Sequence, residues 1–107
     1  MLFLLQPDFA EALNGLSWIL ATASEAEFRN GTEAVRMAER ACELTKRKDP
    51  EKLKTLAAAY GETERIEEAI STAQSAQNIA SKMGLTNRAV ACDRMLEQFR
   101  MGRPWRE

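Results

Sequence analysis

Hydrophobic residues recur every three or four positions along most of the chain, which is the spacing of one face of an α-helix. The first such segment begins at Pro7, a residue suited to the first turn of a helix, and runs to about Thr22. Its apolar stripe consists of Phe9, Leu13, Leu16 and Leu20. A polar stretch over 23–31 interrupts the pattern and ends in Asn30-Gly31, a turn signal. The pattern predicts one helix followed by a long loop.

The same spacing predicts a second helix over about 32–46 and a third from Pro50 to about Glu62. The second has small apolar residues on one face and charged residues on the other, so its charged face is expected to lie in solvent. Asp49 precedes Pro50 as a cap, and proline is favoured in the first turn of a helix. The residues expected to face inward are Ala34, Val35, Ala38, Ala41, Cys42, Leu53, Leu56, Ala57 and Tyr60.

A fourth helix is expected to start near Ile66, after a short turn, and to stop at Gly84, a residue suited to a left-handed cap. Thr86 is then expected to cap a fifth helix that ends near Met101. The apolar positions of the fourth helix are Ile66, Ala69, Ile70, Ala73, Ala76, Ala80 and Met83, and the inward residues of the fifth helix are predicted to be Ala89, Cys92, Leu96 and Phe99. The whole chain is therefore predicted to be a single all-α domain.

Part of the chain repeats itself. Three alanines of the second helix recur 35 positions later in the fourth, and three large residues of the first helix recur 40 positions later in the third. The alanines are Ala34, Ala38 and Ala41 with Ala69, Ala73 and Ala76, and the large residues are Leu13, Leu16 and Leu20 with Leu53, Leu56 and Tyr60. A period in the mid-thirties indicates stacked helix pairs, because one pair cannot cover its own apolar face.

This pattern resembles the tetratricopeptide repeat family. In "PDFAEALNGLSWIL" and again in the third helix, the residues match the large, Leu, small and large positions of that family's first helix, at Leu13, Leu16, Ser17 and Leu20 and at Leu53, Leu56, Ala57 and Tyr60. The resemblance implies an α-solenoid of two antiparallel helix pairs plus a C-terminal capping helix. It divides the chain into an apolar segment 1–6, repeat 1 over 7–47 with an enlarged loop 23–31, repeat 2 over 49–84, the capping helix 86–101 and a tail 102–107. The tail is similar to the ends of longer bacterial proteins of this family.

The charge balance narrows the range of partners. Lys and Arg number 15 and Asp and Glu number 16, so the net charge is −1 and supplies no strong field to attract nucleic acid or an anionic membrane. The apolar start "MLFLL" is too short for a membrane span, which needs about 20 residues, and it lacks the other features of a signal peptide. We therefore expect no nucleic-acid or membrane partner and a cytoplasmic location.

The chain offers little for catalysis or metal binding. It has two cysteines and no histidine, so a zinc site or a Cys/His nucleophile lacks its parts. Cys42 and Cys92 lie among apolar residues at helical spacing and are expected to be buried core residues, although the sequence leaves a disulfide between them open. The glutamates are spread over a solvated surface without a phosphate-binding loop. We expect no catalytic residue, no cofactor, no metal and no enzymatic activity.

The resemblance also implies a function. Members of the family bind extended peptides or partner helices on the concave face formed by the first helix of each pair. Carried over by position, this face would consist of Glu11, Asn14, Trp18, Glu51, Lys54, Ala58 and Glu62. One branch of the family holds a terminal carboxylate with Lys and Asn at two of these positions in its first helix. Because Asn14 and Trp18 stand there in this chain, that clamp is not expected, and the partner is expected to be another protein or peptide segment.

Trp18 and Gly15 each have two interpretations, whereas Trp105 has one expected position. Trp18 either faces the concave side as an anchor for a partner or packs beneath the 23–31 loop against Phe28. Gly15, in the middle of a helix, indicates a close approach by a neighbouring helix or a ligand. Trp105 is expected to cover the last helix as the tail folds back.

The apolar residues Leu2, Phe3, Leu4 and Leu5 precede Pro7 and have no predicted neighbour. Either the chain is the trailing piece of a longer protein, or this segment pairs with a second copy, or it folds across the first helix. The alternative to peptide binding is thus a self-associating structural adaptor, a homodimer through the apolar segment. A terminal piece of a glycosyltransferase-type enzyme that carries such repeats is a more remote alternative.

Overall fold

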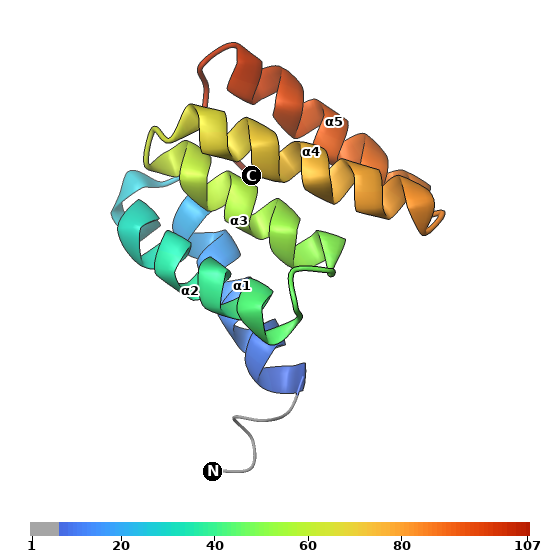
Figure 1. Cartoon of the computed structure of the whole chain (residues 1–107). Helices are drawn as coiled ribbons and strands as arrows, with labels where there is room; N and C mark the ends of the chain where they lie inside the picture. The colour runs from blue at the N-terminus through green and yellow to red at the C-terminus, as the bar shows by residue number, and fades with distance from the viewer. Residues whose placement is uncertain (1–6) are drawn as a thin grey trace.

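The chain folds into a stack of helices, described for residues 7–107 by a computed structural model that gives Pro7 and Asp8 by backbone alone. The described helices are α1 (Pro7–Thr22), the single-turn 3-10 helix η2 (Ala26–Phe28), α2 (Gly31–Leu44), α3 (Pro50–Glu62), α4 (Ile66–Lys82) and α5 (Thr86–Arg100). Consecutive α-helices pack against one another, and α3 also packs against α1 and α5 (Figure 1). The all-α prediction is confirmed for this part of the chain.

The stack is compact. Its radius of gyration is 12.9 Å, close to the ~13 Å expected for a globular domain of this length. Its extents are 43 × 36 × 20 Å, so the helices form a slab that is thin in one direction.

Side chains cap the starts of α2 and α3. Asn30 Oδ1 accepts a hydrogen bond from the Glu33 N–H (3.1 Å), and Asp49 Oδ1 accepts one from the Glu51 N–H (2.9 Å). Such bonds satisfy N–H groups that the first turn of a helix leaves without a partner. The Asp49 cap is as predicted, whereas the sequence predicts Asn30 only as part of a turn.

Residues with positive φ follow the ends of α2, α3, α4 and α5. Gly84 (φ 74°) closes α4 as predicted, and the Leu85 N–H then donates to a carbonyl of the last turn (2.8 Å). Lys46 and Arg47 (φ 57° and 56°) leave the helical region, so α2 ends slightly earlier than expected. The prediction that Thr86 caps α5 is wrong, because Thr86 is itself the first helical residue and the cap position, Leu85, has no side-chain hydrogen bond.

The core is centred on α3, in which ten of 13 residues are buried. The repeated alanines of α2 and α4 are fully buried, as predicted, and small side chains there let the neighbouring helices approach closely. Phe99 of α5 is the largest fully buried side chain, and a Cβ atom placed on Gly61 would lie 2.6 Å from its ring. The close contact between α3 and α5 therefore depends on a glycine.

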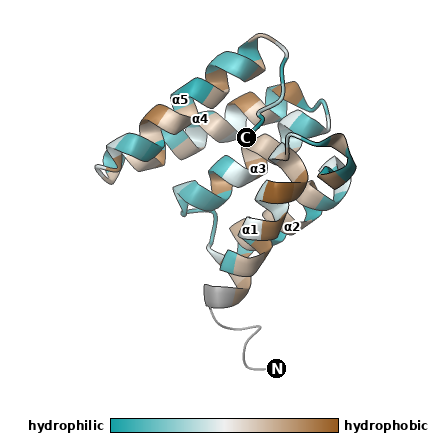
Figure 2. Ribbon diagram, turned by 180° about the vertical axis from the view of Figure 1, so that it is seen from behind, coloured by the Kyte–Doolittle hydropathy of each residue, from teal (hydrophilic) through white to brown (hydrophobic). Residues whose placement is uncertain are grey.

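Helix α1 differs from α3 in what it buries. Its buried residues are small or polar, namely Ala10, Asn14, Ser17, Ala21 and Thr22. Leu16, predicted to face inward, is 45% exposed, and Ile19 is 55% exposed. The reason is that α1 has α2 and α3 as neighbours but no described helix on its outer side, so part of its apolar stripe lies at the edge of the domain (Figure 2).

Candidate functional site

The facing edges of α1 and α3 bring together two of the predicted site residues. Lys54 Nζ lies 4.8 Å from the centre of the Trp18 ring, within the range of a cation–π interaction. Trp18 is half-buried and packs against the core, while Phe28, its alternative contact, is 54% exposed. We call the surface defined by Trp18, Thr22, Lys54 and Glu62 the α1/α3 face.

The α1/α3 face is crossed by residues 103–107, which follow α5 and have no helical structure. The Glu107 N–H donates to the carbonyl of Thr22, the last residue of α1 (2.9 Å), and Glu107 Oε1 accepts from Trp18 Nε1 (3.1 Å). Trp105 is half-buried and packs against the core. The segment thus folds back as expected, but it continues past α5 as far as α1, and the chain end lies near the middle of the domain (Figures 1 and 2).

Glu62, the last residue of α3, lies between two arginines. Its Oε1 is 2.6 Å from Arg106 Nη1 and its Oε2 is 3.3 Å from Arg29 Nε. These contacts are ion pairs without hydrogen-bond geometry, since Glu62 Oε1 and Arg29 Nε have no hydrogen-bond partner. Arg29 is held by its other nitrogen, Nη1, which donates to the carbonyls of Ala23 (2.6 Å) and Ser24 (3.1 Å). A fixed cation on one side and a cation from residues 103–107 on the other therefore neutralise this carboxylate.

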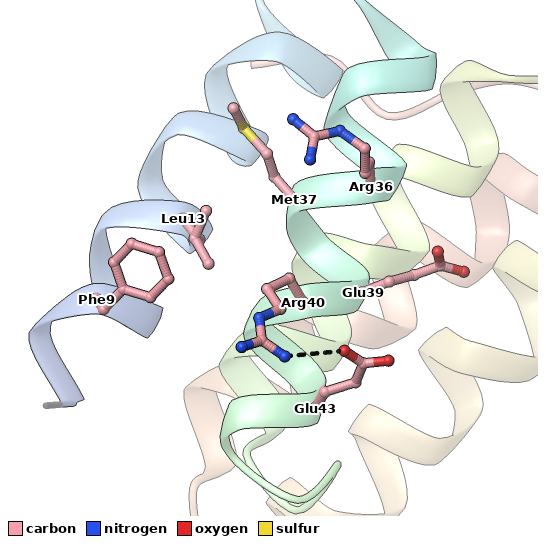
Figure 3. A pocket seen from close by; sticks show the side chains of 7 residues that line it. All are labelled: Phe9, Leu13, Arg36, Met37, Glu39, Arg40 and Glu43. Atoms are coloured by element: carbon pink, nitrogen blue, oxygen red, sulfur yellow. Dashed lines mark ion pairs between the residues drawn. The ribbon is translucent and has the colours of Figure 1, made fainter. Parts of the chain in front are cut away.

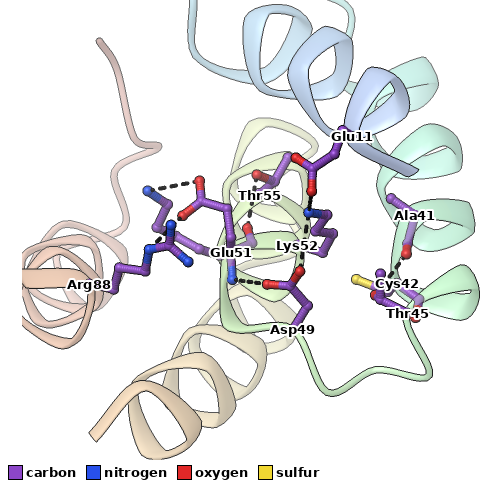
Figure 4. A network of polar contacts seen from close by, with 10 residues as sticks. Glu11, Ala41, Cys42, Thr45, Asp49, Glu51, Lys52, Thr55 and Arg88 are labelled. Atoms are coloured by element: carbon purple, nitrogen blue, oxygen red, sulfur yellow. Dashed lines mark hydrogen bonds and ion pairs between the residues drawn. The ribbon is translucent and has the colours of Figure 1, made fainter. Parts of the chain in front are cut away.

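The first turns of α3 carry a separate charge network (Figure 4). Glu51 pairs with Lys54 (3.5 Å) on the same helix and with Arg88 of α5 (3.6 Å). Because Lys54 also lies over Trp18, this network connects α5 to α1 across α3. Three of the predicted residues, Trp18, Glu51 and Lys54, are thus parts of one continuous arrangement.

Lys52 ties α1 to α3 from a buried position. It is 3% exposed and pairs with Glu11 of α1 and with Asp49 (3.1 Å) (Figure 4). Burial disfavours the charged form of this lysine, but its hydrogen bonds to the two carboxylates outweigh that effect and raise the pKa of Lys52. The predicted site residue Glu11 therefore has a partner within the domain.

The last two predicted residues lie inside the domain. Ala58 is fully buried, and Asn14 is 8% exposed with an Oδ1 atom that has no hydrogen-bond partner. An unsatisfied buried acceptor costs about 1–3 kcal/mol. Asn14 stands between Glu11 and Trp18 on one side of α1 by helical spacing. The interior behind the α1/α3 face thus holds a buried acceptor that has no hydrogen-bond partner in the described chain.

Several residues that take part in the α1/α3 face or in the charge contacts beside it are absent from the predicted site residues. They are Thr22, Arg29, Lys52, Arg88, Arg106 and Glu107. One signal was present in the sequence: Glu62 ends α3, whose last turn has no basic residue, and a carboxylate at a helix C-terminus requires a cation from elsewhere. Which arginine supplies that cation depends on the path of residues 103–107.

A second surface lies between α1 and α2, on the other side of α1. A hollow of about 530 Å³ has apolar side chains of α1 on one side and mainly charged side chains of α2 on the other (Figure 3). Its lining consists of Phe9 and Leu13 from α1 and of Arg36, Met37, Glu39, Arg40 and Glu43 from α2. The exposed Leu16 and Ile19 belong to the same helix, and we call Ala12, Leu16 and Ile19 the outer face of α1. The predicted self-association residues Leu2, Phe3, Leu4 and Leu5 lie outside the described residues.

Both cysteines are buried free thiols, Cys42 in α2 and Cys92 in α5, as predicted. Burial raises the pKa of each thiol to about 11. Burial therefore disfavours the thiolate, the form in which a cysteine acts as a nucleophile.

No protein-family model matches the sequence, and no curated protein or solved structure is significantly similar to it. The resemblance to tetratricopeptide repeats therefore depends on the residue pattern alone. Over residues 7–107, no helix has the length and apolar character needed to cross a membrane. The same residues contain no group of three or more His, Cys, Asp or Glu side chains placed to bind a metal ion.

Proposed function

We propose that this chain is a non-enzymatic protein-interaction domain that binds an extended peptide or a partner helix on the α1/α3 face. The observation that carries the proposal is that this face already holds a non-helical segment, residues 103–107, through one backbone and two side-chain contacts. A surface that accommodates one such segment has the hydrogen-bonding groups to accommodate another. The protein or peptide partner expected from the sequence is the kind of ligand such a face would take.

The finer description of the fold belongs to this proposal. We infer a tetratricopeptide-like α-solenoid, in which α1, α3 and α5 are the first helices of successive units and form its concave side. The sequential packing of the helices, the additional contacts of α3 with α1 and α5, and the recurrence of buried alanines 35 positions apart support it. A concave side formed in this way would be continuous from Trp18 to Arg88.

Gly15 gives this face space for a ligand. A Cβ atom placed on Gly15 would have no neighbour within 4 Å, so the space beside this glycine is open. The close approach inferred for Gly15 from the sequence is not made by another helix of the described chain, which leaves a ligand as the alternative.

The proposal is tested by selecting peptides from a random display library against the full chain and mapping where they bind. The chain has two tryptophans, so its nitrogen-15 spectrum contains two indole N–H signals, and the signal of Trp18 reports on this face. We expect selected peptides to shift the Trp18 signal and to lose binding to Trp18→Ala, with Phe28→Ala, an exposed aromatic, as the matched control. Failure of the library to yield any peptide that shifts the Trp18 signal would contradict the proposal.

A specific observation also favours the alternative function, self-association. The outer face of α1 is apolar, and the sequence carries no charge from Leu13 to Ala23. A homodimer would cover this face, with or without the apolar residues 1–5. Light scattering over a dilution series on the full chain, the chain without residues 1–5 and Leu16→Glu tests it: loss of a dimer in either variant supports self-association, and a monomer throughout contradicts it.

A further inference from the structure

We infer that the α1/α3 face selects an extended segment in which an arginine is followed directly by an acidic residue, and that residues 103–107 compete with such a partner for the same site. The inference rests on the proposed function and adds to it the chemistry of the partner and the identity of the competitor. It follows from how the consecutive residues Arg106 and Glu107 make their contacts.

The arginine position is defined by Glu62. This carboxylate ends α3, where the helix dipole is unfavourable to a negative charge, and the last turn of α3 has no basic residue of its own. Arg29 covers one oxygen and is held in place by the backbone of the 23–31 loop. The other oxygen, Oε1, is available to a guanidinium from outside the helix, and Arg106 occupies it (2.6 Å). The Glu62 carboxylate can therefore pair with one cation from outside the helix, at Oε1.

The acidic position is defined by Trp18 and Thr22. The indole N–H of Trp18 donates to the carboxylate of Glu107, and the Thr22 carbonyl accepts the backbone N–H of the same residue. Thr22 is the last residue of α1, where helical carbonyls lack partners within the helix. Lys54 over the Trp18 ring adds a positive charge close to this position. An acidic side chain is favoured here and a basic one is disfavoured.

The order of the two residues matters because consecutive side chains reach different helices. The Arg106 side chain reaches Glu62 of α3, and the Glu107 side chain reaches Trp18 of α1. In an extended peptide, consecutive side chains likewise point to opposite sides. Exchanging the two residues would bring a carboxylate to Glu62 and a cation to the indole N–H beside Lys54. Both positions would then place like charges or two donors together, which is how a surface rejects a wrong ligand.

The two residues that precede Arg106 help to position the segment. Trp105 packs against the core and supplies apolar contact, and Pro104 fixes its own φ near the extended value. A short connection from α5 holds the segment near its site, and a short flexible tether gives an effective concentration in the millimolar range. A separate partner must therefore displace residues 103–107, and weakening their contacts should expose the site.

The test is calorimetric titration of the full chain with the capped peptide acetyl-Gly-Arg-Pro-Phe-Arg-Glu-amide. The released variant, Arg106→Ala with Glu107→Ala, should bind this peptide about tenfold more tightly than the unchanged chain, because the competing segment is weakened. A peptide with the last two residues exchanged should bind at least about tenfold more weakly. Glu62→Gln in the released variant should lower affinity, whereas Glu67→Gln, an exposed glutamate on α4, should not.

The acidic position has its own test. The released variant should prefer the peptide ending in Glu to one ending in Gln, and Trp18→Phe in that variant should reduce the preference while keeping an aromatic ring, with the charge of Lys54 accounting for what remains. Circular dichroism on each variant checks that the fold is retained. Equal affinities of the released variant and the unchanged chain, or of the two peptide orders, would overturn the inference. If this inference fails but peptides from the library shift the Trp18 signal, the proposed function still stands. If no peptide from the library shifts that signal, the proposed function fails as well.

Discussion

Gly15 in α1 and Gly61 in α3 are both glycines within a helix, yet they have opposite surroundings. A Cβ atom on Gly61 would lie 2.6 Å from Phe99, and one on Gly15 would meet nothing within 4 Å. Helix α3 is covered by α1 on one side and α5 on the other, whereas α1 has no described helix beyond it. The comparison shows that whether a glycine in this stack has room for a side chain depends on the helix packed against it.

The largest effect we expect concerns the titratable groups buried around α3. Burial raises the pKa of Cys42 and Cys92 to about 11, and burial with the Glu39 hydrogen bond raises that of Tyr60 to about 12. The folded state favours the protonated thiols. Their contribution to the free energy of unfolding is therefore complete below the pKa that the thiols have in the unfolded chain, and it is lost as the pH rises from about 9 to 11. The loss should reach on the order of 2 kcal/mol per thiol. Nothing comparable is described in α1.

Urea unfolding at pH 8 and at pH 10.5 measures this loss. The double variant Cys42→Ala with Cys92→Ala should lose less stability between the two pH values than the unchanged chain does. An identical loss in both proteins would contradict the assignment to the thiols.

Gly61→Ala should destabilise the domain by about 1–3 kcal/mol, because the buried Phe99 ring must move to admit the methyl group. Chemical denaturation at pH 7 measures the change. Combining it with Phe99→Leu should recover part of the loss, since the shorter side chain leaves room. If Gly61→Ala leaves the unfolding midpoint unchanged, the contact between α3 and α5 is looser than described.

Gly15→Ala should have the opposite sign and stabilise the domain by up to about 1 kcal/mol, because alanine is the better helix former and its methyl group meets open space. Thermal unfolding followed by circular dichroism measures it. The same variant should weaken peptides from the library if they pass close to this glycine. A destabilised Gly15→Ala would mean that an undetected neighbour occupies that space.

Leu16→Glu and Ile19→Lys should change stability least, within about 0.5 kcal/mol, because both side chains are about half exposed at the edge of the domain. The two variants place opposite charges on the outer face of α1. If that face joins two copies, each variant should be monomeric alone and a mixture should recover association, as seen by light scattering. A large loss of stability in either variant would show that the outer face of α1 is covered within the chain.

The sequence predicts the helices well because each is marked by local signals. Asp49 with Pro50 and Gly84 mark ends, and the repeated alanines mark buried faces, all of which act over a few residues. Leu16 is misjudged because its spacing matches an apolar stripe, while its burial depends on a neighbour that the described chain does not provide. Local pattern cannot tell an edge helix from a central one.

The candidate site is predicted only in part, for a related reason. Trp18, Lys54 and Glu62 follow from their positions in α1 and α3, but their partners come from elsewhere in the chain. Arg106 and Glu107 reach them only because residues 103–107 turn back after α5. An irregular segment has no periodicity from which its path could be read, so its contacts become visible only in the structure.

The central claim is that the α1/α3 face is a binding site for an extended segment and that residues 103–107 occupy it. The most direct measurement is the position of the Trp18 indole N–H signal in the full chain, in Glu107→Gln, and in Glu107→Gln with increasing acetyl-Gly-Arg-Pro-Phe-Arg-Glu-amide. We predict that Glu107→Gln moves the signal away from its position in the unchanged chain and that the peptide returns it along the same line. A Trp18 signal that is indifferent to both Glu107→Gln and the peptide would contradict the account.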